Sequence, residues 1–227
     1  MTCLFSNNFT FPVLINFRNM YDISHFKAHQ YEEVMQFMKA NPFVMICGID
    51  ENQKPVATHV PILIEKRDEK IFLIGHVMRK QLHTIAFEKN NQVLVVFTGS
   101  HSYVSASNYE QQNTASTWNY KAVHASGKMK FLDEEKLLEL LKNLTNKFEN
   151  NLHSPSLVEK MDTNYVKQLM QAIVAFEIEV EEIDHVFKIS QNKDEKTRER
   201  IINSLEIGVN SGANEMAKEM KKFYNKP

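Results

Sequence analysis

The sequence predicts an α+β fold in which short antiparallel strands form a sheet or barrel, with helices at its periphery. Three observations support this prediction. Apolar runs of strand length are separated by short polar turns, as at Phe43–Ile49 and Val56–Ile64. A later segment, Ile173–Glu182, alternates apolar and acidic side chains as a half-buried strand does. Elsewhere apolar residues recur at helical spacing, as in the segment from Tyr31 to Ala40. A meander of short strands of this kind is typical of an antiparallel sheet or barrel.

The composition is that of a globular protein and excludes several classes. The 227 residues are 43% hydrophobic and 24% charged, and a chain of this length is able to bury a sizeable core. A net charge of −1 and a pI near 6.8 give no overall attraction to nucleic acid or to an anionic membrane. No apolar run approaches the length of a transmembrane span. Cys3 and Cys47 form no CxxC pair and no disulfide framework, so we expect a reducing compartment, the cytoplasm.

The chain opens with a segment that we expect to be a tail or an extended arm. Residues 1–19 have no clean periodicity and no apolar run of the kind a signal peptide needs, and Met20 is a candidate start. A helix beginning near Tyr31 is expected to end at Ala40, because Pro42 biases the residue before it away from helical angles.

The first hairpin follows directly. Phe43–Ile49 is predicted to be a buried strand, Asp50–Pro55 a polar turn and Val56–Ile64 the returning strand. Pro61 within the return favours an edge or a bulge, since proline has no N–H to donate to a ladder. Glu65–Lys70 is another charged turn.

The next segment reads as strand, turn, helix and strand. The strand Ile71–Ile74 is expected to end at Gly75, and His76–Gln81 to form a polar, basic turn. A helix then carries Leu82, Ile85 and Ala86 on one face, and Val93–Phe97 is the second strand. The segment Thr98–Trp118 is predicted to be a long connection, and loops of this length inside a domain are often functional.

The second half repeats the same kinds of element. The predicted strands are Tyr120–Leu132, Ile173–Glu182 and Val186–Ser190. Asp133 is a good N-cap for a helix carrying Leu137, Leu141 and Leu144, and a short helix is expected over Tyr165–Gln171. The remainder is charged and helical, with a stripe through Arg198, Ile201 and Leu205 that Gly208 and Gly212 interrupt. The predicted organisation is therefore an N-terminal extension (1–19), one barrel domain (20–193) and a helical C-terminal segment (194–227).

Two adjacent cations mark a candidate anion site. Arg79 and Lys80 stand where a helix begins, at the end whose dipole and unpaired N–H groups favour negative charge. A phosphate group would relieve this conflict through charge-assisted hydrogen bonds. The simpler interpretation is that both cations belong to an ordinary solvated helix face.

A second cluster places Trp118, the one tryptophan of the chain, beside Asn119 and Tyr120. A planar ligand could stack on the indole and be oriented by the amide. Alternatively, Trp118 and Tyr120 simply plug a barrel end. A third cluster, Phe187–Lys193, is polar where a strand passes into a helix and reads as a capped helix start.

Several kinds of catalytic site are not indicated. Nine histidines occur without an HExxH motif or a Cys/His cluster, and His25 and His29 precede the first predicted helix, so no metal site is predicted. There is no GxSxG motif, and Cys47 lies in an apolar strand where a thiol is usually inert. Rossmann and P-loop glycine patterns are also absent.

Taken together, the motifs resemble those of the PaiB family of FMN-binding negative transcriptional regulators. The matching segments are MYDISHF, NPF with PVATHVPI, GHVMRKQ, VVFTGSHSYVS with NY, TWNYKAVHASG and FKISQNK. They run in this order from Met20 to about Leu205, and their number makes the resemblance specific.

The resemblance implies a split β-barrel of the FMN-binding type that forms a homodimer, with FMN bound at the subunit interface. The cofactor-binding positions that it implies are Thr58, His59, Val60, Ile74, Gly75, His76, Arg79, Lys80, Gln81, Trp118 and Asn119. Arg79 and Lys80 match the pair that holds the flavin phosphate in the wider superfamily. Two positions depart from the superfamily pattern: Met78 replaces a serine and Thr58 an arginine, which removes contacts to the phosphate or the ring.

Three functions remain open at this stage. As a regulator, the protein would act indirectly or bind DNA through the basic segment around Lys218 and Lys221, because no helix-turn-helix and no net positive charge are evident. As a flavin-dependent oxidoreductase, it would use His76 or His124 as a proton donor. As a haem-binding or haem-degrading protein, it would need an exposed axial histidine, for which His124 and His185 are the candidates.

Overall fold

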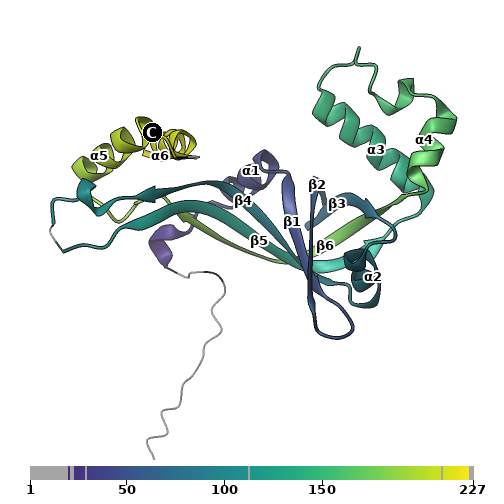
Figure 1. The fold of residues 1–227 in the computed structure, drawn as a ribbon, viewed down its shortest axis with the longest axis horizontal. Helices are drawn as coiled ribbons and strands as arrows, with labels where there is room; N and C mark the ends of the chain where they lie inside the picture. Colours follow the sequence, from purple (N-terminus) through teal and green to yellow (C-terminus); the bar gives the residue numbers. More distant parts are fainter. Residues whose placement is uncertain (1–19, 21–22, 29, 112, 211, 225–227) are drawn as a thin grey trace, which may run out of the picture.

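The computed structural model describes residue 20 and residues 23–28, 30–111, 113–210 and 212–224. Six antiparallel strands close into a barrel in the order β1-β2-β3-β6-β5-β4 (Figure 1). The strands are β1 (Phe43–Ile49), β2 (Pro55–Arg67), β3 (Lys70–Met78), β4 (Gln92–Val104), β5 (Thr117–Phe131) and β6 (Ile173–Lys188). The predicted α+β fold with antiparallel strands is confirmed.

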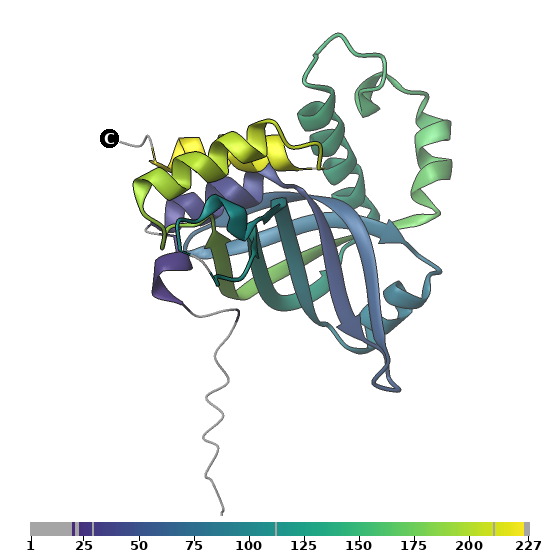
Figure 2. The same ribbon diagram turned by 60° about the vertical axis from the view of Figure 1, so that its left-hand side comes forward.

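Helices lie around the outside of the barrel (Figures 1 and 2). They are η1 (Ser24–Phe26), α1 (Tyr31–Ala40), α2 (Leu82–Lys89), η2 (Ala106–Asn108), α3 (Glu134–Glu149), η3 (Val158–Lys160), α4 (Thr163–Met170), α5 (Glu195–Glu206) and α6 (Ala213–Tyr224). The pair α3 and α4 lies at one end of the molecule, and the pair α5 and α6 lies over the far end of the long strands. None of the described helices is both long and apolar enough to cross a membrane.

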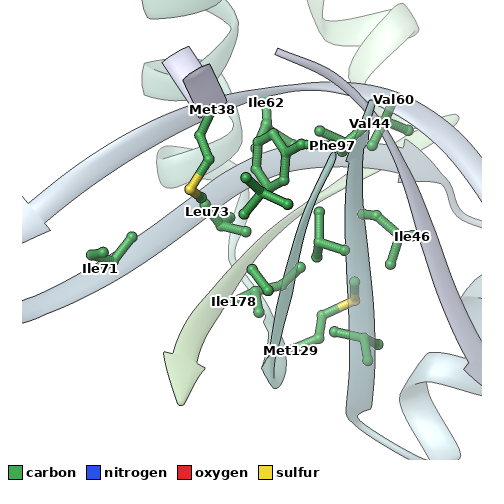
Figure 3. Close-up of a cluster of buried hydrophobic side chains, with 14 of the residues drawn as sticks. Met38, Val44, Ile46, Val60, Ile62, Ile71, Leu73, Phe97, Met129 and Ile178 are labelled. Atoms are coloured by element: carbon green, nitrogen blue, oxygen red, sulfur yellow. The ribbon is translucent and has the colours of Figure 1, made fainter. Parts of the chain in front are cut away.

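The barrel interior is filled by alternate side chains of every strand, as expected for a small barrel. The fully buried members include Ile46, Ile62, Leu73, Phe97, Phe176 and Ile178. Helix α1 closes one mouth of the barrel, and Met38 reaches from it into the cluster beside Leu73 (Figure 3). The apolar stripe that predicted α1 is therefore the face that covers the core.

The outer face of β3 and β6 is covered by a second apolar layer. Ile74 and Ala175 pack there against α3 and α4, whose buried contacts include Leu137 and Met170. Helix α3 begins as predicted, because the Asp133 carboxylate accepts a hydrogen bond from the Lys136 N–H at 2.9 Å.

The C-terminal helices have their own core. Helices α5 and α6 pack on each other and on the end of the barrel sheet, where Ile201 and Met216 are fully buried together with Val104 of β4 and Ile189. The predicted stripe along α5 is the face that enters this core.

Several strands are longer than predicted, because pairing with a neighbour overrides local polarity. Strand β3 continues past Gly75 to Met78, since His76, Val77 and Met78 pair with β6. The segment predicted as a long connection is strand as far as Val104, with an irregularity between Thr98 and His101. The two strands predicted at the end of the barrel are the single strand β6, which pairs with β5 from Phe176 to Lys188.

A bulge in the β5–β6 ladder brings two backbones unusually close. The register shifts between Ser126 and Gly127, so that Ser126 pairs with Glu182 but Gly127 pairs with Val180. A Cβ atom at position 127 would lie 2.1 Å from the carbonyl oxygen of Glu179. Glycine is therefore required here by close approach of the neighbouring strand.

Candidate functional site

The turn between β3 and α2 carries the two cations singled out in the sequence. The Arg79 N–H donates to the Ala172 carbonyl at 2.9 Å, which ties the turn to the start of β6. The hydroxyl of the fully buried Thr84 donates to the Met78 carbonyl at 2.7 Å, which fixes the first turn of α2 against the strand end. The backbone that presents Arg79 and Lys80 is thus held at both ends.

The electrostatics of this turn favour an anion. Gln81 is the N-cap residue of α2, but its side chain accepts no capping hydrogen bond, and the first N–H groups of a helix have no acceptor within it. Arg79 is half-buried and Lys80 exposed, and within the described part of the chain neither forms an ion pair with a carboxylate. Both cations are therefore available to a phosphate group at the helix start.

Strands β2 and β3 separate beside this turn. The pairing of β2 with β3 reaches from Arg67 only to Ile62, which pairs with Gly75; the residues of β2 before it pair with β1 instead. Thr58, His59 and Val60 lie in that first half of β2, where they pair with β1. Val60 is buried in the barrel core, whereas His59 is exposed. The predicted positions on β2, on β3 and in the turn thus share one end of the barrel.

Ile74, Gly75 and His76 lie at the point of separation but differ in their surroundings. The side chain of Ile74 is buried under α3 and α4. A Cβ at position 75 would lie 2.7 Å from the Phe176 ring and 3.1 Å from the Pro61 carbonyl oxygen, so glycine lets the backbones meet here. Burial lowers the pKa of His76, and its buried Nδ1 has no hydrogen-bond partner among the described residues.

Trp118 and Asn119 are adjacent in sequence but face opposite sides of β5. The indole is 53% exposed and lies beside Tyr103 and His101, with ring centroids 6.0 and 6.2 Å away. Asn119 is fully buried, and its Nδ2 donates to the Ser190 hydroxyl at 2.9 Å. Trp118 offers a surface for stacking, whereas the amide of Asn119 holds β5 to the end of β6.

Within one chain the structure separates the two groups of predicted positions. Helix α2 and the Arg79–Lys80 turn lie at one end of the molecule, whereas the start of β5 with Trp118 lies at the other end, near α5 and α6 (Figures 1 and 2). A ligand held at the turn does not reach Trp118 of the same chain.

The surroundings of His185 and Cys47 limit the chemistry that these two side chains could perform. The His185 Nε2 accepts a hydrogen bond from the Ala28 N–H at 2.7 Å, which engages the nitrogen that an axial haem ligand would use. Burial raises the pKa of the Cys47 thiol, which makes it a poor nucleophile. Among the described residues no group of three or more His, Cys, Asp and Glu side chains could hold a metal ion. His29 lies outside the described residues.

The sequence analysis missed a set of residues at the far end of the barrel. The segment Phe187–Lys193, interpreted as a capped helix start, contributes Lys188, Ser190 and Lys193 to a cavity of about 400 Å³. Asp194 does cap α5, accepting a hydrogen bond from the Thr197 N–H at 2.9 Å. The sequence does carry a signal for this set. The segment contains two lysines, Lys188 and Lys193, although the start of a helix needs no cation as its cap.

We expect the protein to lose stability as the pH falls below about 6.5. Burial lowers the pKa values of four histidines, His76, His83, His124 and His185. Below the ordinary histidine pKa of about 6.5, the unfolded chain binds protons that the folded chain does not, so the free energy of unfolding decreases. One such proton changes it by about 1.4 kcal/mol per pH unit. Urea unfolding at pH 8, 7, 6 and 5.5 measures the effect.

The urea concentration at the midpoint of unfolding should stay constant between pH 8 and pH 7 and should fall between pH 7 and pH 5.5. The lowered pKa values of Glu110, Glu181 and Asp194 act only below about 4.5, outside this window. A His76→Gln variant should show a shallower slope. A midpoint that stays constant down to pH 5.5 would contradict the expectation.

Comparisons with known proteins identify the family and the fold of the chain. Residues 20–182 match the family model described as "Putative FMN-binding domain". The chain is 34% identical over 202 residues to the Bacillus subtilis protein named "Protease synthase and sporulation protein PAI 2", covering 89% of this chain and 97% of that protein.

Two solved structures share the fold at low sequence identity. The FAD and heme binding protein from Mycobacterium smegmatis has a TM-score of 0.54 at 14% identity, over 75% of this chain and 77% of that one. The flavocytochrome Anf3 from Azotobacter vinelandii has a TM-score of 0.50 at 16% identity, over 75% and 73%. The split-barrel class expected from the motifs is confirmed.

Proposed function

The chain belongs to the PaiB family, whose matching model is the "Putative FMN-binding domain", and from this premise we propose that it binds FMN through Arg79 and Lys80. The observation that carries the proposal is the β3–α2 turn. Two cations that no carboxylate neutralises, in the described part of the chain, stand just before a helix whose first N–H groups have no acceptor within the helix. A phosphate monoester suits this arrangement, and a neutral ligand does not.

The residues around the turn suit the rest of the cofactor as well. The first half of β2, with Thr58, His59 and Val60, lies beyond the last residue that pairs with β3, and Gly75 lets the backbones approach there. When bound, FMN would supply redox chemistry at its ring, while the protein would hold and orient it. Met78 and Thr58 offer no cation to the phosphate, so affinity rests on Arg79, Lys80 and the helix start.

We further propose that the protein is a homodimer in which each flavin site is completed by the other chain. Trp118 is exposed beside Tyr103 and His101, at the opposite end from the turn. An exposed aromatic group of this kind is typical of an interaction surface. A second copy would bring its Trp118 to the flavin ring that the first copy holds by its phosphate.

We propose that the protein acts in the cytoplasm and that any regulation by it is indirect. The cations of α6 are largely compensated: Lys218 pairs with Glu215 at 3.0 Å and Lys221 with Glu206 at 2.6 Å. With a net charge of −1, the chain offers little to a DNA backbone. We therefore favour a flavin-dependent interaction with another molecule over direct operator binding.

Titration with FMN and with riboflavin tests the proposal. Riboflavin has the same ring but no phosphate, so FMN should bind at least about tenfold more tightly, or about 1.4 kcal/mol. Quenching of flavin fluorescence at 0.15 M salt measures both dissociation constants. The proposal fails if FMN does not bind, or if riboflavin binds equally well.

A further inference from the structure

The outer surface of the barrel has one charged side and one uncharged side. On β6 the outward residues Glu177, Glu179 and Glu181 alternate with apolar ones, and Lys70 pairs with Glu179 at 2.5 Å and Lys128 with Glu181 at 2.8 Å. By contrast, β1 and β4 contain no Asp, Glu, Lys or Arg along their whole lengths. A sheet face that meets water usually carries polar and charged side chains, as β6 does.

The outward side chains of β1 and β4 form an apolar band. Met45 of β1 pairs with Val96 of β4, and Phe43 and Leu94 lie two residues away on the same faces of these strands. Phe43 is 64% exposed, and the other three are half-buried. Among the described residues, these four belong to none of the three buried apolar clusters and do not pack against one. We call these four residues the β1–β4 band.

A second copy of the chain is the partner that suits this band. A twofold axis brings a surface against itself, so a charged face would meet charges of its own sign, whereas an uncharged face meets none. At the edge of the band, the rings of Phe43 and His59 are stacked with their centroids 6.1 Å apart. Exposed aromatic groups beside an apolar surface are typical of the centre of a protein–protein interface.

Strand β4 also connects the two places that the proposed dimer has to bring together. It begins at Gln92, three residues after the end of α2, and near its other end Tyr103 pairs with Trp118. Its 13 residues have their midpoint at the exposed Thr98. A twofold axis at this midpoint reverses the direction of β4 between the two chains. The Trp118 end of each chain then lies over the α2 end of the other.

The band lies at this midpoint. The register in which Met45 pairs with Val96, when it is extended by two residues, places Phe43 level with Thr98. The most exposed apolar side chain of the band is therefore beside the point where the axis would pass. Each Phe43 would meet the band of the other chain, and both chains would lose the same apolar surface to water.

We propose that the β1–β4 band is the dimer interface, packed against the same band of a second copy around a twofold axis near Phe43 and Thr98. This inference rests on the homodimer proposed above and names its surface. The arrangement places the Trp118 of each chain beside the Arg79–Lys80 turn of the other. Because the contact is apolar, the dimer forms without flavin.

Sedimentation velocity of the flavin-free protein at about 10 μM tests the interface. Wild type should sediment as a dimer of the 26.5 kDa chain. Phe43→Glu places two carboxylates near the axis and should raise the dissociation constant of the dimer at least about 100-fold. Phe148→Glu is the matched control: Phe148 is 51% exposed near the end of α3, and this variant should stay dimeric. A monomeric wild type, or a Phe43→Glu variant as dimeric as wild type, overturns the proposal.

Variants of opposite charge distinguish loss of the contact from misfolding. Phe43→Glu and Phe43→Lys should each be monomeric, because like charges meet at the axis. An equimolar mixture of the two should form dimers again, since each glutamate then faces a lysine. Only folded chains can regain the contact in this way. A mixture that stays monomeric overturns the placement of the axis near Phe43.

Titration with FMN separates this inference from the proposed flavin site. Trp118 is the one tryptophan of the chain, so tryptophan emission reports whether the flavin lies near it. FMN should quench most of this emission in the wild-type dimer and little of it in monomeric Phe43→Glu, which should still prefer FMN to riboflavin. Equal quenching in both overturns the arrangement. A dimer that loses its association in Phe43→Glu but binds no FMN supports the interface and contradicts the flavin site, and a monomeric wild type that prefers FMN does the reverse.

Discussion

Replacing Arg79 and Lys80 together by alanine is expected to weaken FMN binding by about 10- to 100-fold, or about 1.4–2.8 kcal/mol. Each side chain would make charge-assisted hydrogen bonds with the phosphate, and such bonds are the strongest of their kind. Flavin fluorescence titration measures the change. Riboflavin binding should be nearly unaffected, because the phosphate is the group that the two cations recognise.

A comparison of Lys80 with Lys89 distinguishes a direct contact with the phosphate from a general effect of positive charge. Lys80 precedes the start of the helix and Lys89 is its last residue, and both are exposed. Lys80→Ala should weaken FMN binding, whereas Lys89→Ala should leave it within about twofold of wild type. The assignment of the phosphate to this turn is wrong if the double variant folds normally and retains wild-type affinity for FMN.

Gly127→Ala is expected to lower the free energy of unfolding by about 3 kcal/mol or more. The added methyl group would lie 2.1 Å from the Glu179 carbonyl oxygen and 3.0 Å from the Val180 Cα. These are backbone atoms of a paired strand, so no side chain can rotate away to relieve the contact. For a chain of this length the melting temperature should fall by roughly 6–12 °C, which calorimetry or circular dichroism measures.

The same substitution at Gly208 is the control. There the nearest atoms to an added Cβ are the Ser204 and Leu205 carbonyl oxygens at 3.2 and 3.3 Å, at the end of α5. The expected loss is under about 1 kcal/mol. Equal melting temperatures for the two variants would show that the β5–β6 bulge tolerates a side chain, contrary to the close approach described above.

The elements that the sequence predicted well are those whose signal is local. Helix α1 and strand β1 have the predicted bounds because an apolar stripe, a following proline and a continuous apolar run each define them without reference to distant residues. Asp133 likewise caps α3 through its own neighbour in sequence.

Elements that depend on distant partners were predicted less well. The polar segment Asp184–His185 looked like a break between two strands, yet it is held in β6 by pairing with His124 and Val123 of β5. His76–Met78 looked like a turn for the same reason, and pairing with the start of β6 makes it strand. Polarity along one chain does not reveal which backbone groups a neighbouring strand will satisfy.

The candidate site was predictable in part. The position of Arg79 and Lys80 just before a helix could be predicted from the sequence, because the apolar residues of that helix follow them directly along the chain. The burial of Asn119 does not, since its partner Ser190 is 71 residues away in sequence. The FMN role of the other implied positions stays a prediction, and so does the homodimer that would bring Trp118 to the flavin.

Strand β6 runs from the Arg79–Lys80 turn to the end of the barrel that carries Trp118, since Lys188 pairs with Tyr120 of β5. The Arg79 N–H is bonded to Ala172, just before the strand begins, and Lys188 is its last residue. The 16 residues between these points span roughly 50 Å of backbone at about 3.3 Å per residue. No single small molecule can bridge that length inside one chain. In the proposed dimer, the flavin held by one chain therefore contacts only the Trp118 of the other chain, and a monomeric variant should lose that contact.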